Sequence, residues 1–584
     1  MTQSVTGRFW RERNRDDRVA LALAQQLNLD EVVGRVLAGR GVTLETCAQF
    51  LKPTLKDHLP DPSRFQDMDR AAARLAQAIM SGEQVAVFGD YDVDGATSSA
   101  VLSRFFDAVG GRIVIYIPDR MTEGYGPNGP ALVRLKEEGA SVAVTVDCGT
   151  SAHDPLAVGK AAGLDIIVVD HHQAEPQLPD VFALVNPNRL DESGECGQLA
   201  AVGVTYLLAI AVNRQLRLNG WYREDRQEPN LLQWLDLVAL GTICDVVPLT
   251  GINRALVTQG LKIMAQRSNV GLVALADVAG VQDRPGTYHA GFILGPRVNA
   301  GGRVGRSELG ARLLSTDDPG EAQDIAVELD RYNQERRAIE AMVQEQAIAD
   351  TDASLAGNVP GALIMVAGKN WHPGVIGIVA SRLRERYRRP AFVIAVADGV
   401  GKGSGRSIPG VDLGAAVTAA KQAGLLINGG GHKMAAGITV DESRITELQD
   451  FFTARLDPHV QESADQNSLG FDGALAVKGA TRDLVDILEQ AGPYGSGNVE
   501  PRFAVSRAKV VKADLVGDGH VRCILAGQDG GRLKAIAFRS ADNPLGESLL
   551  NSGGRLIHVA GHLRADNWRG DRNAQLMIDD TAWA

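Results

Sequence analysis

The side chains best able to do chemistry are acids and histidines that follow short apolar runs in the first half of the chain. They are Asp90, Asp92, Asp94, Asp147, His171, His172 and Asp245. The first three stand at alternate positions, and carboxylates this close repel one another and raise one another's pKa values unless cations neutralise them. Oxygen ligands joined by an imidazole or two favour Mg²⁺ or Mn²⁺, and histidine tilts the choice toward Mn²⁺. The pattern therefore indicates a divalent metal site.

A solvated acidic turn and a calcium loop are the alternatives for the acidic run. The calcium loop of an EF-hand needs a glutamate at its twelfth position, and Val101 stands there when the count starts at Asp90. Cys148 and Cys244 adjoin two of the acids, but neither spacing supplies a cysteine–histidine pair, so packing is the better interpretation. The five cysteines include no CxxC pair and indicate neither a disulfide framework nor a thiolate zinc site.

The elements that must position these side chains are short strands. Apolar, β-branched runs at 84–89, 112–118, 142–147 and 165–170 alternate with helical patterns, which is typical of βα units. Strands this uniformly apolar are covered on both faces, so they predict a parallel sheet between helices. In such sheets ligands bind at the carboxyl ends of the strands, where the acids and histidines are expected. The predicted fold class is therefore α/β.

Further along the chain the pattern changes twice. The segment 324–350 has the spacing of one long amphipathic helix, a natural spacer between domains. Apolar strands that begin at Ala362 and Ala391 mark a second, smaller α/β domain that ends near Val440. From Phe503 onward, alternating runs separated by Gly and Asp turns predict a small β-barrel or sandwich.

Composition narrows the class of protein. A chain of 584 residues, 45% hydrophobic and 22% charged, predicts about three or four globular domains and excludes a disordered or fibrous protein. The longest apolar stretch, 199–212, is shorter than the roughly 20 residues that cross a bilayer, and no signal segment follows the N-terminal arginines. We therefore expect a cytoplasmic protein with no membrane partner. The formal charge is −11, yet residues 361–440 carry ten Lys and Arg against three acids, as a polyanion-binding section would.

Several motifs resemble those of a known family. DYDVDG at 90–95, TVDCGT at 145–150, VVDHH at 168–172 and the later Asp245 resemble the four motifs of DHH-family phosphoesterases. Three further runs, WHPGVIGIVASRL at 371–383, GKGSGRS at 401–407 and GGGHKMAAG at 429–437, are similar to a companion DHHA1 domain. AGPYGSGNVEPRF at 491–503 resembles the beginning of an OB-fold. Together the order and spacing of these motifs cover nearly the whole chain.

The resemblance implies a division into five parts. A parallel-sheet DHH domain is joined by a long helix to a smaller α/β DHHA1 domain, and a C-terminal β-barrel of the OB type follows. The implied parts are an N-terminal helical extension at 1–70, the DHH catalytic domain at 71–320, the connecting helix at 321–350, the DHHA1 domain at 351–457 and the OB-fold DNA-binding domain at 458–584.

The resemblance also implies two divalent metal ions, Mn²⁺ or Mg²⁺, as cofactors. Their ligands would be Asp90, Asp92, Asp94, Asp147, His171 and Asp245. Asp147 would bridge the ions and act with His171 in catalysis, while His172 would lie beside the scissile phosphate. Phe88 stands where many relatives in the wider superfamily carry a histidine, so Asp90 is inferred to take that ligand role. Paired ions activate water for in-line displacement without a covalent nucleophile.

Residues that would contact substrate follow from the same resemblance. Arg120, Ser404 and Arg406 would hold a 5′-phosphate, because an arginine fork and a hydroxyl beside glycines suit a phosphate dianion. The remaining candidates are Arg297, Asn299 and Arg303 for the DNA backbone near the metals, His432 for another phosphate, Tyr125 for base stacking, and Trp568 with Arg569 and Phe538 for a strand-binding surface. Local packing is the alternative for Tyr125 and Phe538.

The function that the resemblance implies is 5′ to 3′ exonuclease activity on single-stranded DNA. Two-metal hydrolysis would release mononucleotides, in recombination and repair, alongside a single-strand-binding protein and a helicase. One rival is a DHH–DHHA1 phosphodiesterase for short oligonucleotides or cyclic dinucleotides, which would need neither the OB-like part nor so long a chain. A catalytically inactive strand-binding module is the other, and it is disfavoured because every motif acid and both histidines are present.

Overall fold

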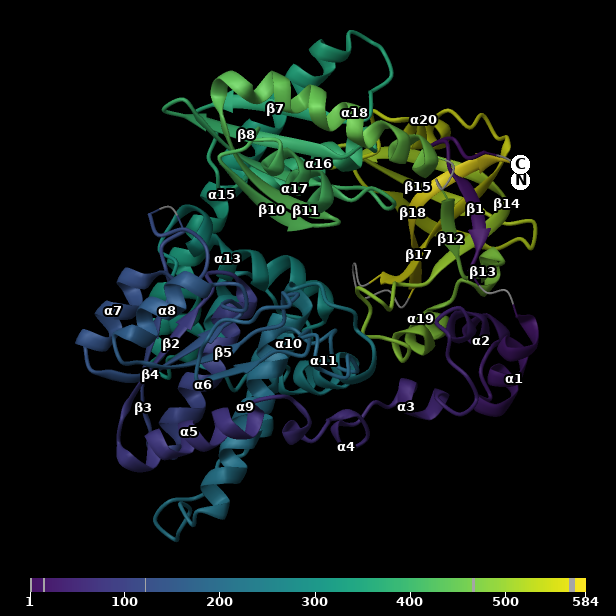
Figure 1. Ribbon diagram of the computed structural model, residues 1–584. Coiled ribbons are helices and arrows are strands. Elements are labelled where there is room, and N and C mark those ends of the chain that lie inside the picture. Colours follow the sequence, from purple (N-terminus) through teal and green to yellow (C-terminus); the bar gives the residue numbers. More distant parts are fainter. Residues whose placement is uncertain (1–2, 14–15, 121, 465–467, 567–572) are drawn as a thin grey trace.

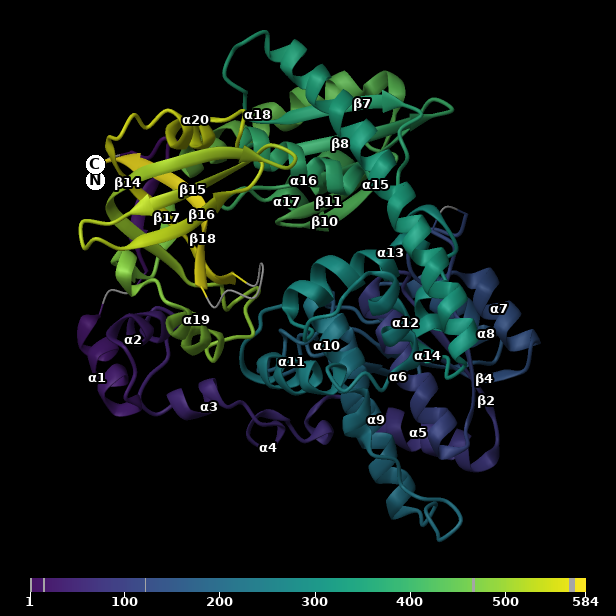
Figure 2. The same cartoon turned by 180° about the vertical axis from the view of Figure 1, so that it is seen from behind.

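The computed structural model describes residues 3–13, 16–120, 122–464, 468–566 and 573–584. The described chain forms three units, the long helix α15 (Pro319–Leu355) joins the first to the second, and the two chain ends lie next to each other on the C-terminal unit (Figures 1 and 2). Within the described part of the chain no helix combines the length and apolarity needed to span a membrane.

The first unit is built on a five-stranded parallel sheet with strand order β3-β2-β4-β5-β6. One face packs on α5, α6 and α9 through residues such as Val85 and Val144, and the other packs on α7 and α8 through residues such as Phe88 and Val168. The predicted parallel sheet between two helix layers is thus confirmed. Its elements are α5 (Met68–Ser81), β2 (Gln84–Gly89), α6 (Val93–Val109), β3 (Arg112–Tyr116), α7 (Gly129–Glu137), β4 (Ala140–Val146), α8 (His153–Ala161), β5 (Asp165–Val169), β6 (Ala183–Val185) and α9 (Ala201–Leu218).

A group of helices completes this unit and leads to the next. They are α10 (Leu235–Cys244), α11 (Gly251–Met264), α12 (Val270–Val278), the π-helical segment η3 (His289–Leu294), α13 (Gly295–Val304) and α14 (Leu309–Ser315). The long helix α15 begins earlier than the periodicity predicts, because Asp318 caps it by accepting bonds from Gly320 N and Glu321 N. Its first turns pack on α12 and α13, and Val343 and Ala347 near its end pack in the core of the second unit.

The second unit has a mixed sheet with strand order β10-β11-β9-β8-β7. Only β7 and β8 are parallel, and the three later strands run antiparallel to their neighbours. Helices α15 and α16 cover one face, and α17 and α18 cover the other. The elements are β7 (Ile364–Lys369), α16 (Ile376–Tyr387), β8 (Ala391–Ala397), β9 (Val400–Arg406), α17 (Leu413–Gln422), β10 (Asn428–His432), β11 (Ala435–Asp441) and α18 (Ile445–Ala464).

The third unit is a six-stranded sheet with order β13-β14-β15-β16-β18-β17. Strand β14 pairs with β17 as well as with β15, so the pairing of five strands returns to its start. The register of β14 with β17 is irregular between Val505 and Ala508, shortly before β14 begins to pair with β15 at Lys509. The elements are β13 (Gly473–Ala474), α19 (Arg482–Glu489), β14 (Arg502–Val516), β15 (His520–Ala526), β16 (Arg532–Ala537), α20 (Pro544–Leu550), β17 (Leu556–Asp566) and β18 (Asn573–Trp583).

The N-terminal segment is built onto this third unit. Strand β1 pairs in parallel with β12, and Leu23, Val36 and Leu37 share one hydrophobic core with Phe503 and Val559. In Figure 1 the purple helices run from the C-terminal unit back to the first unit. The elements are β1 (Phe9–Glu12), α1 (Asp17–Leu27), α2 (Glu31–Ala38), α3 (Cys47–Leu51), α4 (Leu55–His58) and β12 (Ser468–Phe471).

Asp472 anchors the N-terminal segment to the C-terminal unit. Its fully buried carboxylate accepts hydrogen bonds from Arg13 Nη1 at 2.6 Å, from Arg40 Nη1, and from the backbone N–H of Arg502 at 2.9 Å. Asp472→Ala is expected to lower the free energy of unfolding by about 3–5 kcal/mol, because it leaves a buried guanidinium without its anion. Urea unfolding measures the change. Asp486→Ala is the matched control, since Asp486 pairs with Arg482 at the surface of α19 and its loss should leave the transition in place.

Candidate active site

The predicted metal ligands lie at one edge of the first sheet. Asp90 and Asp92 follow β2, Asp147 follows β4, and His171 comes two residues after β5 ends. Because these three strands are parallel neighbours, their carboxyl ends place the side chains together. Asp147 adopts a left-handed backbone conformation with φ of 61°, which is uncommon for a residue other than glycine.

The remaining acids arrive from helices. Asp92 caps α6 by accepting a bond from Gly95 N at 3.0 Å, which places Asp94 in the first turn. Both oxygens of Asp94 accept backbone bonds at the start of α9, from Ala201 N at 2.7 Å and Val202 N at 2.8 Å. Asp245 stands at the C-terminal end of α10, far from the others in sequence. The turn after it is unusual too, since Val246 has φ of 61°.

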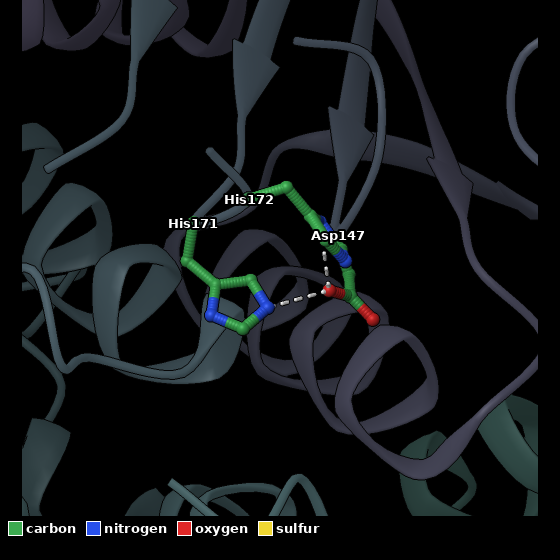
Figure 3. Close-up of side chains that lie close together, drawn as sticks. All are labelled: Asp147, His171 and His172. Carbon is green, nitrogen blue, oxygen red and sulfur yellow. Dashed lines mark ion pairs between the residues drawn. The ribbon is translucent and has the colours of Figure 1, made fainter. Parts of the chain in front are cut away.

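Asp147 is the centre of the cluster. Its Oδ1 lies 3.3 Å from His171 Nε2 and 4.0 Å from His172 Nδ1, and both rings lie beside the carboxylate (Figure 3). His171 Nε2 is also 3.9 Å from Asp94 Oδ2, while its Nδ1 is 3.7 Å from Asp245 Oδ2. Asp147 and His171 therefore lie close to His172, Asp94 and Asp245.

Potential ligand atoms gather in three sets, within each of which they lie within 4.8 Å of one another. The sets are Asp90, Asp92 and Asp147; Asp94, His171 and Asp245; and Asp147, His171 and His172. Asp147 belongs to two sets and so does His171. The structure thus brings together all seven residues for which the sequence predicts a metal-binding or catalytic role.

The electrostatics of the cluster fit cations. Burial first, and then the charges of neighbouring acids, raise the pKa values of Asp90, Asp94 and Asp147 well above their usual range. Burial and the charge of Asp92 raise the pKa of Asp245 to about 7. Among the described residues, Asp245 Oδ2 is buried and has no hydrogen-bond partner. Buried acids that repel one another need compensating positive charge, which divalent ions would supply.

Asp170 is a functional candidate that the sequence analysis did not assign. Its buried Oδ1 lies 2.7 Å from His172 Nδ1 and also accepts the backbone N–H of His171 at 2.8 Å. Its Oδ2 accepts Thr150 N at 3.0 Å. Burial disfavours the charged imidazole, but the bond to Asp170 and its charge outweigh burial and raise the pKa of His172 to about 9. The available signal was position, because Asp170 directly precedes both histidines after a buried strand.

The predicted 5′-phosphate residues come from two units. Arg406 Nη1 donates to Ser404 Oγ at 3.0 Å on β9, and both side chains pass close to Gly377, where a Cβ would come within 2.9 Å of Arg406 Nη2. Burial, and then the charges of Arg384 and Arg120, lower the pKa of Arg406. A bound anion would reduce the repulsion between these guanidinium groups. Arg120 itself lies over the ring of Tyr91, with its Cζ 5.1 Å from the ring centroid.

Other predicted substrate residues have different surroundings. Tyr125 is exposed, and its ring is edge-on to Tyr91 at 6.3 Å between centroids. His432 is exposed at the end of β10 and is not part of the cavity described next. Trp568 and Arg569 fall outside the described residues.

A cavity of about 1200 Å³ lies between the three units. Arg297, Asn299 and Arg303, which the resemblance assigns to contacts with a DNA backbone, line this cavity. Two of these guanidinium groups already have partners: Arg297 Nε pairs with Asp330 at 2.8 Å, and Arg303 Nη1 donates to Gly374 O at 3.0 Å. Further cations that the sequence analysis did not select line the same cavity, namely Arg336, Arg337, Arg382, Arg386 and Arg539. A helix interpreted only as a spacer, α15, therefore lines the cleft.

Comparison with known families accounts for most of the chain. Residues 84–242 match the DHH family, N-terminal domain; residues 360–457 match the DHHA1 domain; and residues 471–580 match the RecJ OB domain. Each match falls on one of the three units described above.

Individual relatives match over nearly the full length. "Single-stranded-DNA-specific exonuclease RecJ" of Salmonella typhimurium is 36% identical, with 95% of this chain and 96% of that protein covered. The protein of the same description from Bacillus subtilis is 32% identical over 98% of this chain and 70% of its own length. The crystal structure of RecJ with Mn²⁺ from Thermus thermophilus superposes with a TM-score of 0.78 at 30% identity, covering 98% of this chain and 79% of that one. The chain belongs to the RecJ family of single-stranded-DNA-specific exonucleases.

Proposed function

We propose that this protein is a metal-dependent exonuclease that degrades single-stranded DNA from the 5′ end to mononucleotides. The observation that carries the proposal is a buried acid–histidine cluster in a chain whose three units also enclose an arginine-lined cleft. Relatives described as single-stranded-DNA-specific exonucleases support the substrate, and RecJ structures that contain Mn²⁺ or Mg²⁺ support the metals.

The acids and His171 are proposed to hold two divalent ions, Mn²⁺ or Mg²⁺. Bound there, such ions would polarise the phosphoryl oxygens, lower the pKa of a water and neutralise charge on the departing oxygen. His172, kept charged by Asp170, would donate a hydrogen bond to the scissile phosphate. Burial raises the pKa values of Cys148 and Cys244, which disfavours a thiolate nucleophile at either position.

Selection of the 5′ end is assigned to Arg120, Ser404 and Arg406. A terminal phosphate carries more charge than an internal phosphodiester, so clustered guanidinium groups beside a hydroxyl favour it. Arg297, Asn299 and Arg303 would then contact the backbone between this end and the rest of the cleft. Tyr125, on the side of the cluster near Asp147, would stack on a base.

Substrate length and strandedness test the assignment. A long 5′-phosphorylated single strand is expected to be degraded in Mn²⁺ to mononucleotides, with a kcat/KM at least about 10-fold above that for a blunt duplex or a dinucleotide. The reason is that only a long single strand contacts both the cationic 5′ grouping and the cleft. Quantitative gel and chromatographic product analysis makes the comparison. Equal preference for the dinucleotide would transfer the assignment to the short-oligonucleotide phosphodiesterase.

We further infer a cytoplasmic role in recombination and repair, on strands that a helicase unwinds and a single-strand-binding protein covers. The likeness of the chain to RecJ proteins supports this role. Binding of the purified protein to each partner, measured by surface plasmon resonance, tests the two interactions separately.

A further inference from the structure

Two aromatic rings lie exposed at the boundary of two cavities. Tyr288 and Phe292 are stacked with ring centroids 5.6 Å apart and an interplanar angle of 24°. Exposed fractions of 55% and 74% are high for side chains of this size, which normally bury most of their apolar surface. Phe292 belongs to the π-helical segment η3, and π-helical turns are frequently found at functional sites.

The aromatic pair lies between the arginine-lined cleft and a second cavity next to Asp245. Both rings line the cavity of about 1200 Å³ already described. Both also line a second cavity of about 660 Å³, which includes Val246, the residue directly after Asp245. Cys244, on the other side of Asp245, lines this second cavity too, so a strand that extends from the acids through it into the cleft would pass these rings.

The segment that carries the rings is fixed relative to the metal cluster. Arg297 Nη1 donates to Ile293 O at 2.7 Å, and Arg297 Nε pairs with Asp330 of α15. Cys244, the last residue of α10 and the neighbour of Asp245, makes an Sγ contact of 3.5 Å with Ala290 O. These contacts hold η3 at a constant distance from the acids.

Positive charge around the two rings favours an anionic ligand such as a nucleic-acid strand. Among the described residues, Arg337 and Arg539 line the larger cavity and form no ion pair with an acid. Cations that follow a backbone, next to flat apolar rings, are the features by which proteins hold single strands without reading sequence.

We propose that Tyr288 and Phe292 form a stacking platform for one or two unpaired bases on the 3′ side of the scissile bond. The 5′ end is assigned to Arg406 in the second unit, so the strand beyond the metals is the part that reaches η3. This inference rests on the proposed function for its substrate. Paired bases in a duplex cannot insert onto the rings, so the platform also favours single strands over duplexes.

Replacement of the rings tests the platform. Phe292→Ala and Tyr288→Ala are each expected to weaken the binding of a 20-nucleotide 5′-phosphorylated strand by about 5- to 150-fold, the range for loss of one stacked base. Fluorescence anisotropy in EDTA measures affinity without hydrolysis. Tyr288→Phe keeps the ring and should bind as the unchanged protein does. Leu218→Ala is the matched control, because Leu218 is also 74% exposed and lines neither cavity.

A scan with single abasic nucleotides separates stacking from a general loss of fold. In the unchanged protein, one or two positions on the 3′ side should weaken binding when they lack a base, and in the double variant Tyr288→Ala/Phe292→Ala those positions should no longer matter. Thermal unfolding verifies that the variants fold. Unchanged affinity in both single variants, or the same abasic pattern in the double variant, would overturn the platform. Absence of nuclease activity in the unchanged protein would instead refute the proposed function, while the abasic scan in EDTA still tests the platform.

Discussion

Asp147→Asn is expected to reduce the kcat for single-strand degradation by about 1000-fold or more. Asparagine keeps the shape of the side chain but removes the charge at the centre of the cluster, where Asp147 belongs to two of the three potential ligand sets. Affinity for a 5′-phosphorylated strand in EDTA should change little, because the cationic groups that bind the strand remain. Single-turnover hydrolysis and fluorescence anisotropy measure the two quantities.

Although Asp147→Asn should impair catalysis, the same substitution is expected to stabilise the folded protein when no metal is bound. Burial raises the pKa of Asp147 in the folded state, so the folded protein holds its proton more tightly than the unfolded chain does. The free energy of unfolding therefore falls as the pH rises from the pKa of Asp147 in the unfolded chain toward its higher pKa in the folded protein. This loss of stability persists at pH 8. In EDTA at pH 8, Asp147→Asn is expected to unfold at a higher temperature than the unchanged protein.

Added Mn²⁺ should reverse that order. A ligand at 100 times its Kd stabilises the folded state by about 2.7 kcal/mol, and the variant should lose most of this gain. Differential scanning calorimetry with and without Mn²⁺ makes the comparison. Asp180→Asn serves as the control, because Asp180 forms an exposed pair with Lys160 and should leave the Mn²⁺ response intact. Full activity and a full Mn²⁺ response in Asp147→Asn would contradict the proposed centre.

Asp170→Asn is expected to lower kcat at pH 8 by about 100- to 10,000-fold. The bond between Asp170 Oδ1 and His172 Nδ1 orients the ring and keeps it charged, and loss of an acid in that position has effects of this size in other histidine pairs. Asp170 is a positioning residue, so its loss should also change the pH profile. Without the carboxylate the pKa of His172 falls below its value of about 9, because the bond and charge that raise it are lost.

The pH profile distinguishes this role from a structural one. If charged His172 is needed, activity of the unchanged protein should decline as pH rises through about 9, and the decline in Asp170→Asn should begin at lower pH. Measurements of kcat between about pH 6 and pH 10 show the two limbs. Asp154→Asn is the control, since Asp154 is an exposed acid in the first turn of α8. If the decline of kcat at high pH occurs at the same pH in Asp170→Asn as in the unchanged protein, catalysis does not require a charged His172.

Local patterns in the sequence predicted most of the metal cluster. Apolar runs predict the buried strands, and acids directly after these runs must lie where the strands end. Asp90, Asp147 and His171 could therefore be assigned to one sheet edge from the order of residues alone. The same reasoning extends to the long helix, whose periodicity was visible, although Asp318 places its start earlier than the pattern did.

Contacts between distant segments could not be predicted in this way. Asp472 binds Arg13, 459 positions away, and β1 joins a sheet with β12, so the N-terminal helices belong to the core of the C-terminal unit. The resemblance predicts that Arg297 contacts a DNA backbone, but its pair with Asp330 and its bond to Ile293 O of η3 could not be predicted from the sequence. Periodicity records only which side of an element is apolar, not which other element covers it.

The sequence alone predicted the candidate metal-binding side chains, the strands that end at most of them and the class of chemistry, because polar residues directly after apolar runs can be recognised locally. Only the tertiary structure decided that Asp170 holds His172, that α15 lines the cleft, and that Tyr288 and Phe292 remain uncovered. The contact of Asp170 with His172 depends on the conformation of the loop after β5, and the other two features depend on how separate units pack against one another. Many different long-range packings are compatible with the same local pattern, and the folded chain selects one of them.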